Sequence, residues 1–282
     1  MQLTVDNIQE YKGIYEPSIR AKYLCDSGYH IVENFITLEY ANKLRLEVLH
    51  QFSYQTKEYS IAPNDSEYGQ VRSPFLESQL IRDFISSDNL IEIARNNLIG
   101  CPIFHLVNGQ VVAPNNAHNQ SKWHKDLNKV HISSPPLAVN CLLFLGSVEH
   151  STELQTSYFN QIGTQDFLIV PQSHMSSNVP EFTAESQLLR IRPGTLLIFN
   201  SLLWHRVVNM SCYQFFLNVM FTEPFIKQQL LRAGASEDWM QANGGIDSPL
   251  SQLLGFWSQP PASIDEFRNP PGGLRSYRGN QG

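Results

Sequence analysis

The segment with the clearest potential for chemistry is Ser121–Asn128, which contains His124 and Asp126. If this segment is a β-strand, both side chains point to the same face, because alternate residues of a strand share a face. An imidazole beside a carboxylate supplies two of the three ligands in the two-histidine, one-carboxylate arrangement that holds Fe(II). The third ligand is then a distant histidine on another strand, and His205 is the best candidate.

The other histidines provide the alternatives to His205. His174 ends the segment Val-Pro-Gln-Ser-His and is a second candidate for the third ligand, although a loop that closes over the site is a more common role. His105 lies in a β-rich run and faces either the core or the site. His118 and His131 are expected in solvated loops, and the remaining histidines at structural or surface positions.

Short β-rich runs between turn residues predict the elements that position these side chains. They follow a helical start of the chain, in which Thr37 caps a helix over Glu39–Phe52 and residues 75–98 fit one or two helices. Many short strands after such a start indicate a jelly roll of two packed sheets. The expected strands are Tyr29–Ile36, Pro102–Val107, Gln110–Val112, Trp123–Asp126, Val139–Leu145, Phe167–Val170, Leu188–Arg192, Thr195–Phe199, Trp204–Val208 and Gln214–Phe221.

We expect one domain over residues 1–282, with the jelly-roll core at about 101–223 and helical flanks at 1–100 and 224–282. Residues 54–74 read as an irregular loop. Residues 225–257 read as helix broken at Gly244-Gly245, and the proline- and glycine-rich tail reads as an extended segment.

Composition restricts the class of protein. The chain has 282 residues, 42% hydrophobic and 16% charged, which is enough to bury a sizeable core. Its net charge is −6 and it has no run of lysine or arginine, which argues against nucleic acid as a partner. The 4 cysteines are scattered without a CxxC motif, and no signal peptide or membrane-length apolar run is apparent. We therefore expect a cytoplasmic protein that binds a small molecule rather than a membrane.

Several segments, in this order, resemble the phytanoyl-CoA dioxygenase superfamily. They are Gly28–Ile36, Trp123–Asp126, Ile169–His174, Arg192–Asn200, Leu203–His205 with Asn209-x-Ser211, and a C-terminal stretch over 254–268. The resemblance implies a cupin-like double-stranded β-helix that uses Fe(II), 2-oxoglutarate and dioxygen, with His124, Asp126 and His205 as the catalytic metal ligands. Halogenating relatives have Ala or Gly in place of Asp126, so its carboxylate implies hydroxylation, or desaturation, epoxidation or cyclisation.

The chain departs from the family at the co-substrate. The family usually has an arginine shortly after the distal histidine, where it pairs with the C5 carboxylate of 2-oxoglutarate, but the run over 209–218 contains none. Gln214 is the nearest fit and offers neutral donors only, whereas burying an unpaired carboxylate costs several kcal/mol. Lys122 would share the inward face of His124 on an unbroken strand. Thr164 is a further candidate for the co-substrate, and Arg190 and Arg206 are less favoured.

Candidate substrate contacts are Arg72, Asn218 and Trp204, and the loop over 148–163 is long enough to act as a lid. No basic cluster suits the phosphates of coenzyme A, so we expect a free, small, polar metabolite of specialised metabolism. Two other classes stay open. One is a metal-binding barrel without turnover, which the missing arginine favours, and the other is a hydrolase with zinc on the same three residues.

Overall fold

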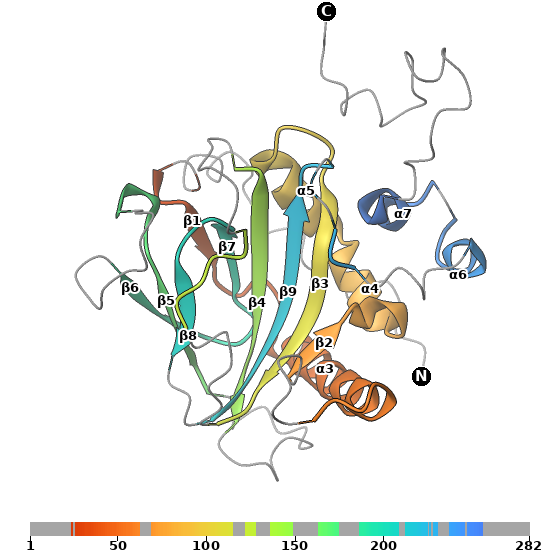
Figure 1. Ribbon diagram of the computed structural model, residues 1–282, viewed down its shortest axis with the longest axis horizontal. Coiled ribbons are helices and arrows are strands. Elements are labelled where there is room, and N and C mark those ends of the chain that lie inside the picture. The colour runs from red at the N-terminus through yellow and green to blue at the C-terminus, as the bar shows by residue number, and fades with distance from the viewer. Residues whose placement is uncertain are drawn as a thin grey trace, which may run out of the picture.

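A computed structural model describes residues 24, 26–62, 69–114, 122–127, 136–148, 163–174, 186–208, 212–224, 226, 228–230, 237–245 and 247–255. Its strands form two antiparallel sheets, with the order β1-β7-β4-β9-β3-β2 in the larger sheet and β6-β5-β8 in the smaller (Figure 1). The strands are β1 (Tyr29–Val32), β2 (Gln70–Arg72), β3 (Ile103–Val112), β4 (Ala138–Val148), β5 (Gln165–Ile169), β6 (Gln187–Ile191), β7 (Leu196–Asn200), β8 (His205–Val208) and β9 (Tyr213–Thr222).

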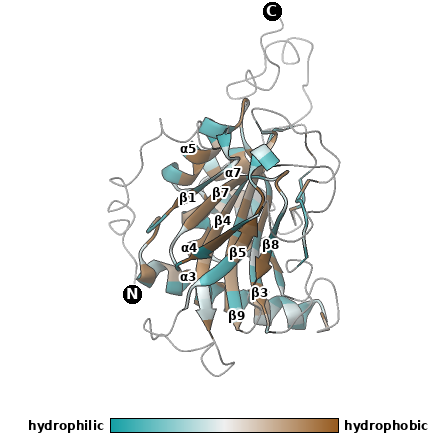
Figure 2. Ribbon diagram, turned by 90° about the vertical axis from the view of Figure 1, so that its left-hand side faces the viewer, coloured by the Kyte–Doolittle hydropathy of each residue, from teal (hydrophilic) through white to brown (hydrophobic). Residues whose placement is uncertain are grey.

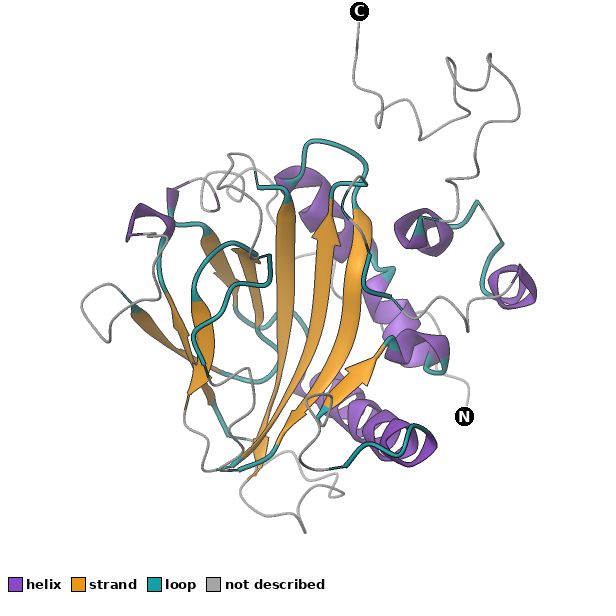
Figure 3. Ribbon diagram, in the orientation of Figure 1, coloured by secondary structure: helices purple, strands orange, loops and turns teal. Residues whose placement is uncertain are grey.

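The two sheets and the helices form layers. Helices lie on one side of the larger sheet and the smaller sheet lies on the other (Figure 3). The expected fold class, a mainly β jelly roll with flanking helices, is confirmed. The helices are α3 (Leu38–Glu58), α4 (Gln79–Ile85), α5 (Asp88–Asn97), α6 (Glu237–Ala242) and α7 (Pro249–Leu254), with short 3-10 turns at Pro74–Leu76 and Gln172–His174.

Helix α3 begins where the sequence predicts. The Thr37 side chain accepts a hydrogen bond from the backbone N–H of Tyr40, which satisfies one of the unpaired donors at the helix start. Ala41, Leu44 and Val48 are fully buried, because they form the stripe that packs against the larger sheet. The helix is longer than predicted and ends at Glu58.

The central strands β4 and β9 are buried on both faces, so they are hydrophobic along most of their length (Figure 2). Their alternate side chains enter two different apolar clusters. One cluster contacts the helices and includes Val139, Cys141, Leu143, Phe215, Leu217 and Val219. The other lies between the two sheets and includes Leu142, Phe144 and Phe216 with Phe167 and Phe199. The second cluster surrounds the interior in which the predicted ligands lie.

The structure corrects three local predictions. Residues 54–74 are not one irregular loop, because β2 lies within them and pairs with β3. The two runs predicted over 102–112 form one strand, β3. Its Gly109 reads as a turn residue, but a Cβ there would lie 2.8 Å from a methyl group of Val48, so the glycine permits the close approach of α3. In the described part of 225–257 only α6 and α7 are helical, and the predicted break is found at Gly244 and Gly245, both at positive φ.

Some predictions lie outside the described residues. They concern the first 23 residues, His118 and His131, the lid over 149–162, the segment 209–211 and the C-terminal tail from 256. Within the described ranges, none of the helices has both the length and the apolar character of a membrane span. The single-domain organisation stays a prediction.

Candidate metal centre

The two histidines of the predicted triad are held side by side by the backbone. His124 N donates to His205 O at 3.1 Å, and His205 N donates to His124 O at 3.0 Å. Directly opposed residues of an antiparallel pair project their side chains to the same face. The predicted strand over Trp123–Asp126 is thus reduced to one isolated bridge, which continues the smaller sheet beyond β8.

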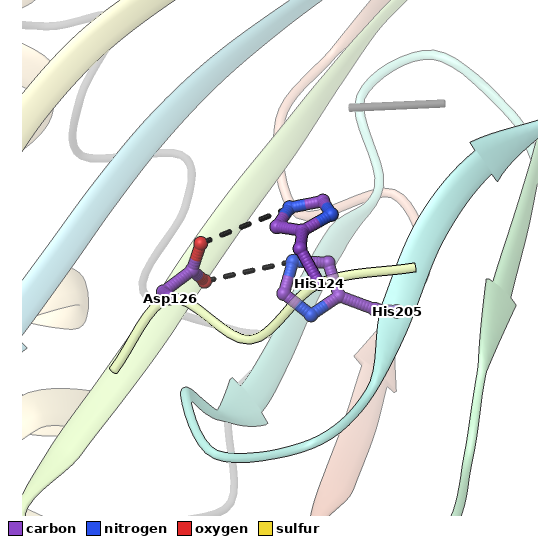
Figure 4. A group of neighbouring side chains, drawn as sticks. All are labelled: His124, Asp126 and His205. Atoms are coloured by element: carbon purple, nitrogen blue, oxygen red, sulfur yellow. Dashed lines mark ion pairs between the residues drawn. The ribbon is translucent and has the colours of Figure 1, made fainter. Parts of the chain in front are cut away.

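Asp126 completes a group of three ligands (Figure 4). Its Oδ2 lies 3.5 Å from Nε2 of His205 and its Oδ1 lies 3.9 Å from Nε2 of His124. The three potential ligand atoms all lie within 4.8 Å of one another, so they could hold one metal ion. The structure therefore brings together the three residues that the sequence nominated from two distant segments.

Backbone carbonyls set the tautomers of both imidazoles. Nδ1 of His124 lies 2.8 Å from Lys122 O, and Nδ1 of His205 lies 2.9 Å from Leu203 O. A carbonyl only accepts, so each Nδ1 carries the proton and each Nε2 presents a lone pair to the centre. Nε2 of His124 is buried and has no hydrogen-bond partner among the described residues, as expected for a metal ligand.

The environment of His205 favours the form that binds metal. The imidazole is buried, and its ring lies 5.6 Å from that of Phe167 and 4.8 Å from that of Phe199. Burial, assisted by His124, lowers the pKa of His205 to about 4, against the opposing effect of the Asp126 carboxylate. The imidazole is therefore neutral near pH 7, and a neutral imidazole is required for coordination.

Asn140 is a site residue that the sequence analysis missed. It lies on β4, is fully buried, and its Nδ2 donates a short hydrogen bond to Oδ2 of Asp126. The backbone N–H of Asp126 donates to Ser201 O at 3.1 Å, so both ends of the residue are held. The available signal was an amide in the apolar run Val139–Leu145, at a position that shares the inner face of Leu142.

Two cation–π pairs support the bridge from its outer face. Lys125 Nζ lies 4.7 Å from the centre of the Trp204 ring, and the Arg206 guanidinium carbon lies 5.2 Å from the centre of the Trp123 ring. These four residues flank the two histidines, so their side chains alternate with them and point away from the centre. Trp204, nominated as a substrate contact, therefore belongs to this outer face.

The residues nominated for the co-substrate are dispersed. Lys122 and Thr164 are exposed, and Lys122 loses its expected inward direction because no strand runs through it. Gln214 is buried and its Nε2 donates to Val208 O at 3.0 Å.

His174, the alternative third metal ligand, is exposed and contacts Ser173, so within the described residues it is not a ligand of this group.

The inner face of the larger sheet carries polar side chains beside the triad. His105 is buried at the irregularity of β3 between Phe104 and Leu106, and burial lowers its pKa against the opposing effect of the Asp126 carboxylate. Asn218 and Arg72 occupy inward positions on β9 and β2. Atoms of His105, Asn140, Asn218 and Thr222 have no hydrogen-bond partner among the described residues. This wall suits a polar ligand.

Comparison with known proteins supports the fold. No family model matches the chain. Two uncharacterised proteins, Mb1539 of Mycobacterium bovis and Rv1501 of Mycobacterium tuberculosis, are each 26% identical over 214 residues, which cover 71% of this chain and 71% of theirs. Crystal structures of EctD from S. alaskensis are similar in fold. The form with bound Fe has a TM-score of 0.56 at 14% identity, covering 78% of this chain and 79% of EctD. The form with 2-oxoglutarate and 5-hydroxyectoine has a TM-score of 0.53 at 13% identity, covering 78% of each chain.

Proposed function

We propose that this protein is an Fe(II)- and 2-oxoglutarate-dependent oxygenase that hydroxylates a small, polar metabolite, in the biosynthesis of natural products. The observation that carries the proposal is the convergence of His124, Asp126 and His205 inside a jelly roll. Two imidazole nitrogens and one carboxylate oxygen form the ligand set of non-haem iron oxygenases, in which the remaining positions stay open. The crystals of EctD, which has a similar fold, contain Fe in one case and 2-oxoglutarate in the other.

The residues present fit an iron ion. Both Nε2 atoms carry lone pairs, because each Nδ1 faces a carbonyl, and Asp126 is held by Asn140. When bound, iron would couple the decarboxylation of 2-oxoglutarate by dioxygen to oxidation of a substrate C–H bond, giving succinate, CO2 and an alcohol. The chain itself contributes the ligands, their orientation and the exclusion of water by the aromatic rings around His205.

The inner wall supports a polar substrate. His105, Asn140 and Thr222 are each at least nine-tenths buried, and each has an atom without a partner among the described residues. Buried polar groups are normally hydrogen-bonded, so a ligand with hydroxyl, amine or amide groups would satisfy them. An apolar substrate would leave them unsatisfied at a cost of about 1–3 kcal/mol each.

The test is anaerobic addition of Fe(II) and 2-oxoglutarate to the metal-free protein. We expect the weak visible absorption band of the iron–2-oxoglutarate chelate, and its loss in His205→Ala and His124→Ala. Zn(II) in place of Fe(II) is the matched control, since it binds the same ligands and gives no such band. Succinate release with candidate metabolites then measures turnover. Absence of the band in the iron-loaded protein would refute the proposal and leave the zinc hydrolase or the metal-binding barrel.

A further inference from the structure

The C5 carboxylate of 2-oxoglutarate would need a cation inside the jelly roll. Three of the candidate lysine and arginine side chains point elsewhere. The described strand β9 contains neither lysine nor arginine. Lys122 is exposed, Arg206 contacts Trp123 on the outer face, and Arg190 is exposed beside Asp166. An anion buried without a cation or several donors is unstable, so another positive group must serve if the carboxylate is bound there.

Arg72 on β2 is on the correct face. It pairs directly with Asn108 of β3, Asn108 pairs with Asn218 of β9, and Asn218 pairs with Leu142 of β4. Directly opposed residues share a face of a sheet, and Leu142 belongs to the cluster between the two sheets. The row Arg72–Asn108–Asn218 therefore lies on the inner face, toward the metal centre.

The side chains of this row are linked. In the amide orientation that satisfies both its neighbours, Asn108 donates to Val107 O at 2.9 Å and its oxygen accepts from Nη1 of Arg72 at 2.9 Å. The guanidinium thus reaches over β3 toward β9. Oδ1 of Asn218 is buried without a partner among the described residues, and its amide can rotate to present either an acceptor or two donors.

The row is also close to the metal ligands. Asn140, which donates to Asp126, pairs with Met220 of β9, and Met220 is two residues from Asn218. Asn218 and Asn140 are thus diagonal neighbours, about 7–8 Å apart by Cα atoms. Adjacent strands are about 4.8 Å apart, so β2 lies only two strand spacings from β9, a gap that the arginine side chain partly spans.

We propose that Arg72, Asn108 and Asn218 form a carboxylate subsite that binds the far end of 2-oxoglutarate, in place of the arginine missing from β9. The inference rests on the proposed function. Arg72 supplies the positive charge, its planar guanidinium matches the geometry of a carboxylate, and the Asn218 amide can rotate to supply a neutral donor. The five-carbon co-substrate would extend from the metal along the inner face of β9 toward this row.

Gln55 of α3 is the positioning residue for this subsite. Its Nε2 donates to Arg72 O at 2.9 Å, and its Oε1 accepts from Arg72 N at 2.9 Å. The Gln55 amide therefore makes the two hydrogen bonds with the backbone of Arg72 that a further strand would make at the edge of β2. We expect Gln55→Ala to loosen the backbone of Arg72 and to weaken binding of the same carboxylate by a smaller factor than removal of Arg72 itself.

The experiment compares 2-oxoglutarate with 2-oxopentanoate, which has the same chain length and metal-binding head but lacks the second carboxylate. Both are titrated anaerobically into the Fe(II) protein, followed by the chelate absorption band. We expect Arg72→Gln to weaken 2-oxoglutarate binding about 10- to 100-fold, as for loss of a hydrogen-bonded charge, and to change 2-oxopentanoate binding less than about twofold. Arg72→Lys should give an intermediate loss. Arg95→Gln removes an exposed charge on α5 and should change neither affinity.

The outcomes separate this inference from the proposed function. If the wild-type protein forms a chelate and Arg72→Gln keeps the full preference for 2-oxoglutarate, the subsite is refuted and the function stands. If Arg72→Gln weakens both acids equally, Arg72 acts only on the fold and the subsite is again refuted. If the variant changes only the KM of an acidic substrate, the carboxylate belongs to that substrate and the assignment to the co-substrate is wrong. If the wild-type protein forms no chelate with either acid, the proposed function fails as well.

Discussion

Replacing Asn140 by leucine should separate metal affinity from stability. The Asn140 amide donates to the carboxylate of Asp126, and hydrogen bonds to charged groups contribute about 1.5–3 kcal/mol. Outer partners of metal ligands typically change metal affinity by about 10- to 100-fold when removed, which is the same range of free energy. We therefore expect the Kd of the metal-free protein for Fe(II) to rise about 10- to 100-fold in Asn140→Leu.

The free energy of unfolding should respond differently from the metal affinity, because the Oδ1 atom of Asn140 destabilises the fold. Its Oδ1 is buried without a partner among the described residues, at a cost of about 1–3 kcal/mol. Leucine has a similar size, removes this cost and adds apolar contacts with Phe199 and Met220, its neighbours in register. The lost hydrogen bond to Asp126 offsets these gains, so the free energy of unfolding of the metal-free protein should change by less than about 1 kcal/mol. Asn140→Ala, which leaves a small cavity instead, should lose both affinity and stability.

The assay is anaerobic Fe(II) titration against a competing chelator, together with urea unfolding of the metal-free protein. Asn97→Leu on α5 is the matched control, since Asn97 is buried and donates to Ile93 O at 2.9 Å, away from the triad. It should lose stability and keep the wild-type metal affinity. An Fe(II) Kd of Asn140→Leu within twofold of wild type would show that the Asn140 amide does not orient Asp126.

Three further outcomes are expected. The low pKa of His205, about 4 against 6.5 for the unfolded chain, means that the unfolded state binds more protons between these values. The free energy of unfolding of the metal-free protein should therefore fall by up to roughly 3 kcal/mol from pH 7 to pH 4, and a pH series with no such fall would contradict the buried neutral imidazole. Trp204→Leu removes the cation–π contact with Lys125 and should weaken Fe(II) binding about two- to fivefold while retaining the chelate band, as checked by the same titration. Glu223→Ala should destabilise the protein by about 2–3 kcal/mol in urea unfolding, because its buried carboxylate accepts the backbone N–H groups of Ile99 and Gly100; an unchanged midpoint would refute this role.

Spacing and order in the sequence predicted the fold class and the grouping of His124, Asp126 and His205. The missed features depend on long-range pairing. β2 is three residues long, and β3 and the Gln55 side chain satisfy its two edges. Periodicity within one segment carries no signal for such a strand.

The predicted inward direction of Lys122 failed for a related reason. Parity along a strand applies only close to bridged residues; in the described part of this segment, His124 alone forms a β-bridge, and Lys122 lies two residues away from it. Asn140 was missed because β4 is buried on both faces. Such a strand lacks the alternation of polar and apolar residues that would show which face Asn140 occupies. The face on which a residue of such a strand lies can be predicted only once its partner strands are known.

The alternation of β4 and β9 between two apolar clusters separates the face of the larger sheet that packs against the helices from the face that borders the candidate metal centre. Up to the irregularity of β4 between Phe144 and Gly146, odd-numbered side chains of these strands pack against the helices, whereas even-numbered ones face the interior between the sheets. Substitutions at inner polar positions such as Asn218 can therefore change the polarity of the interior without disturbing the packing of the helices. A library randomised at inner polar positions alone, with Leu142, Phe144 and Phe216 kept, would vary the lining of the interior in a population that remains largely folded.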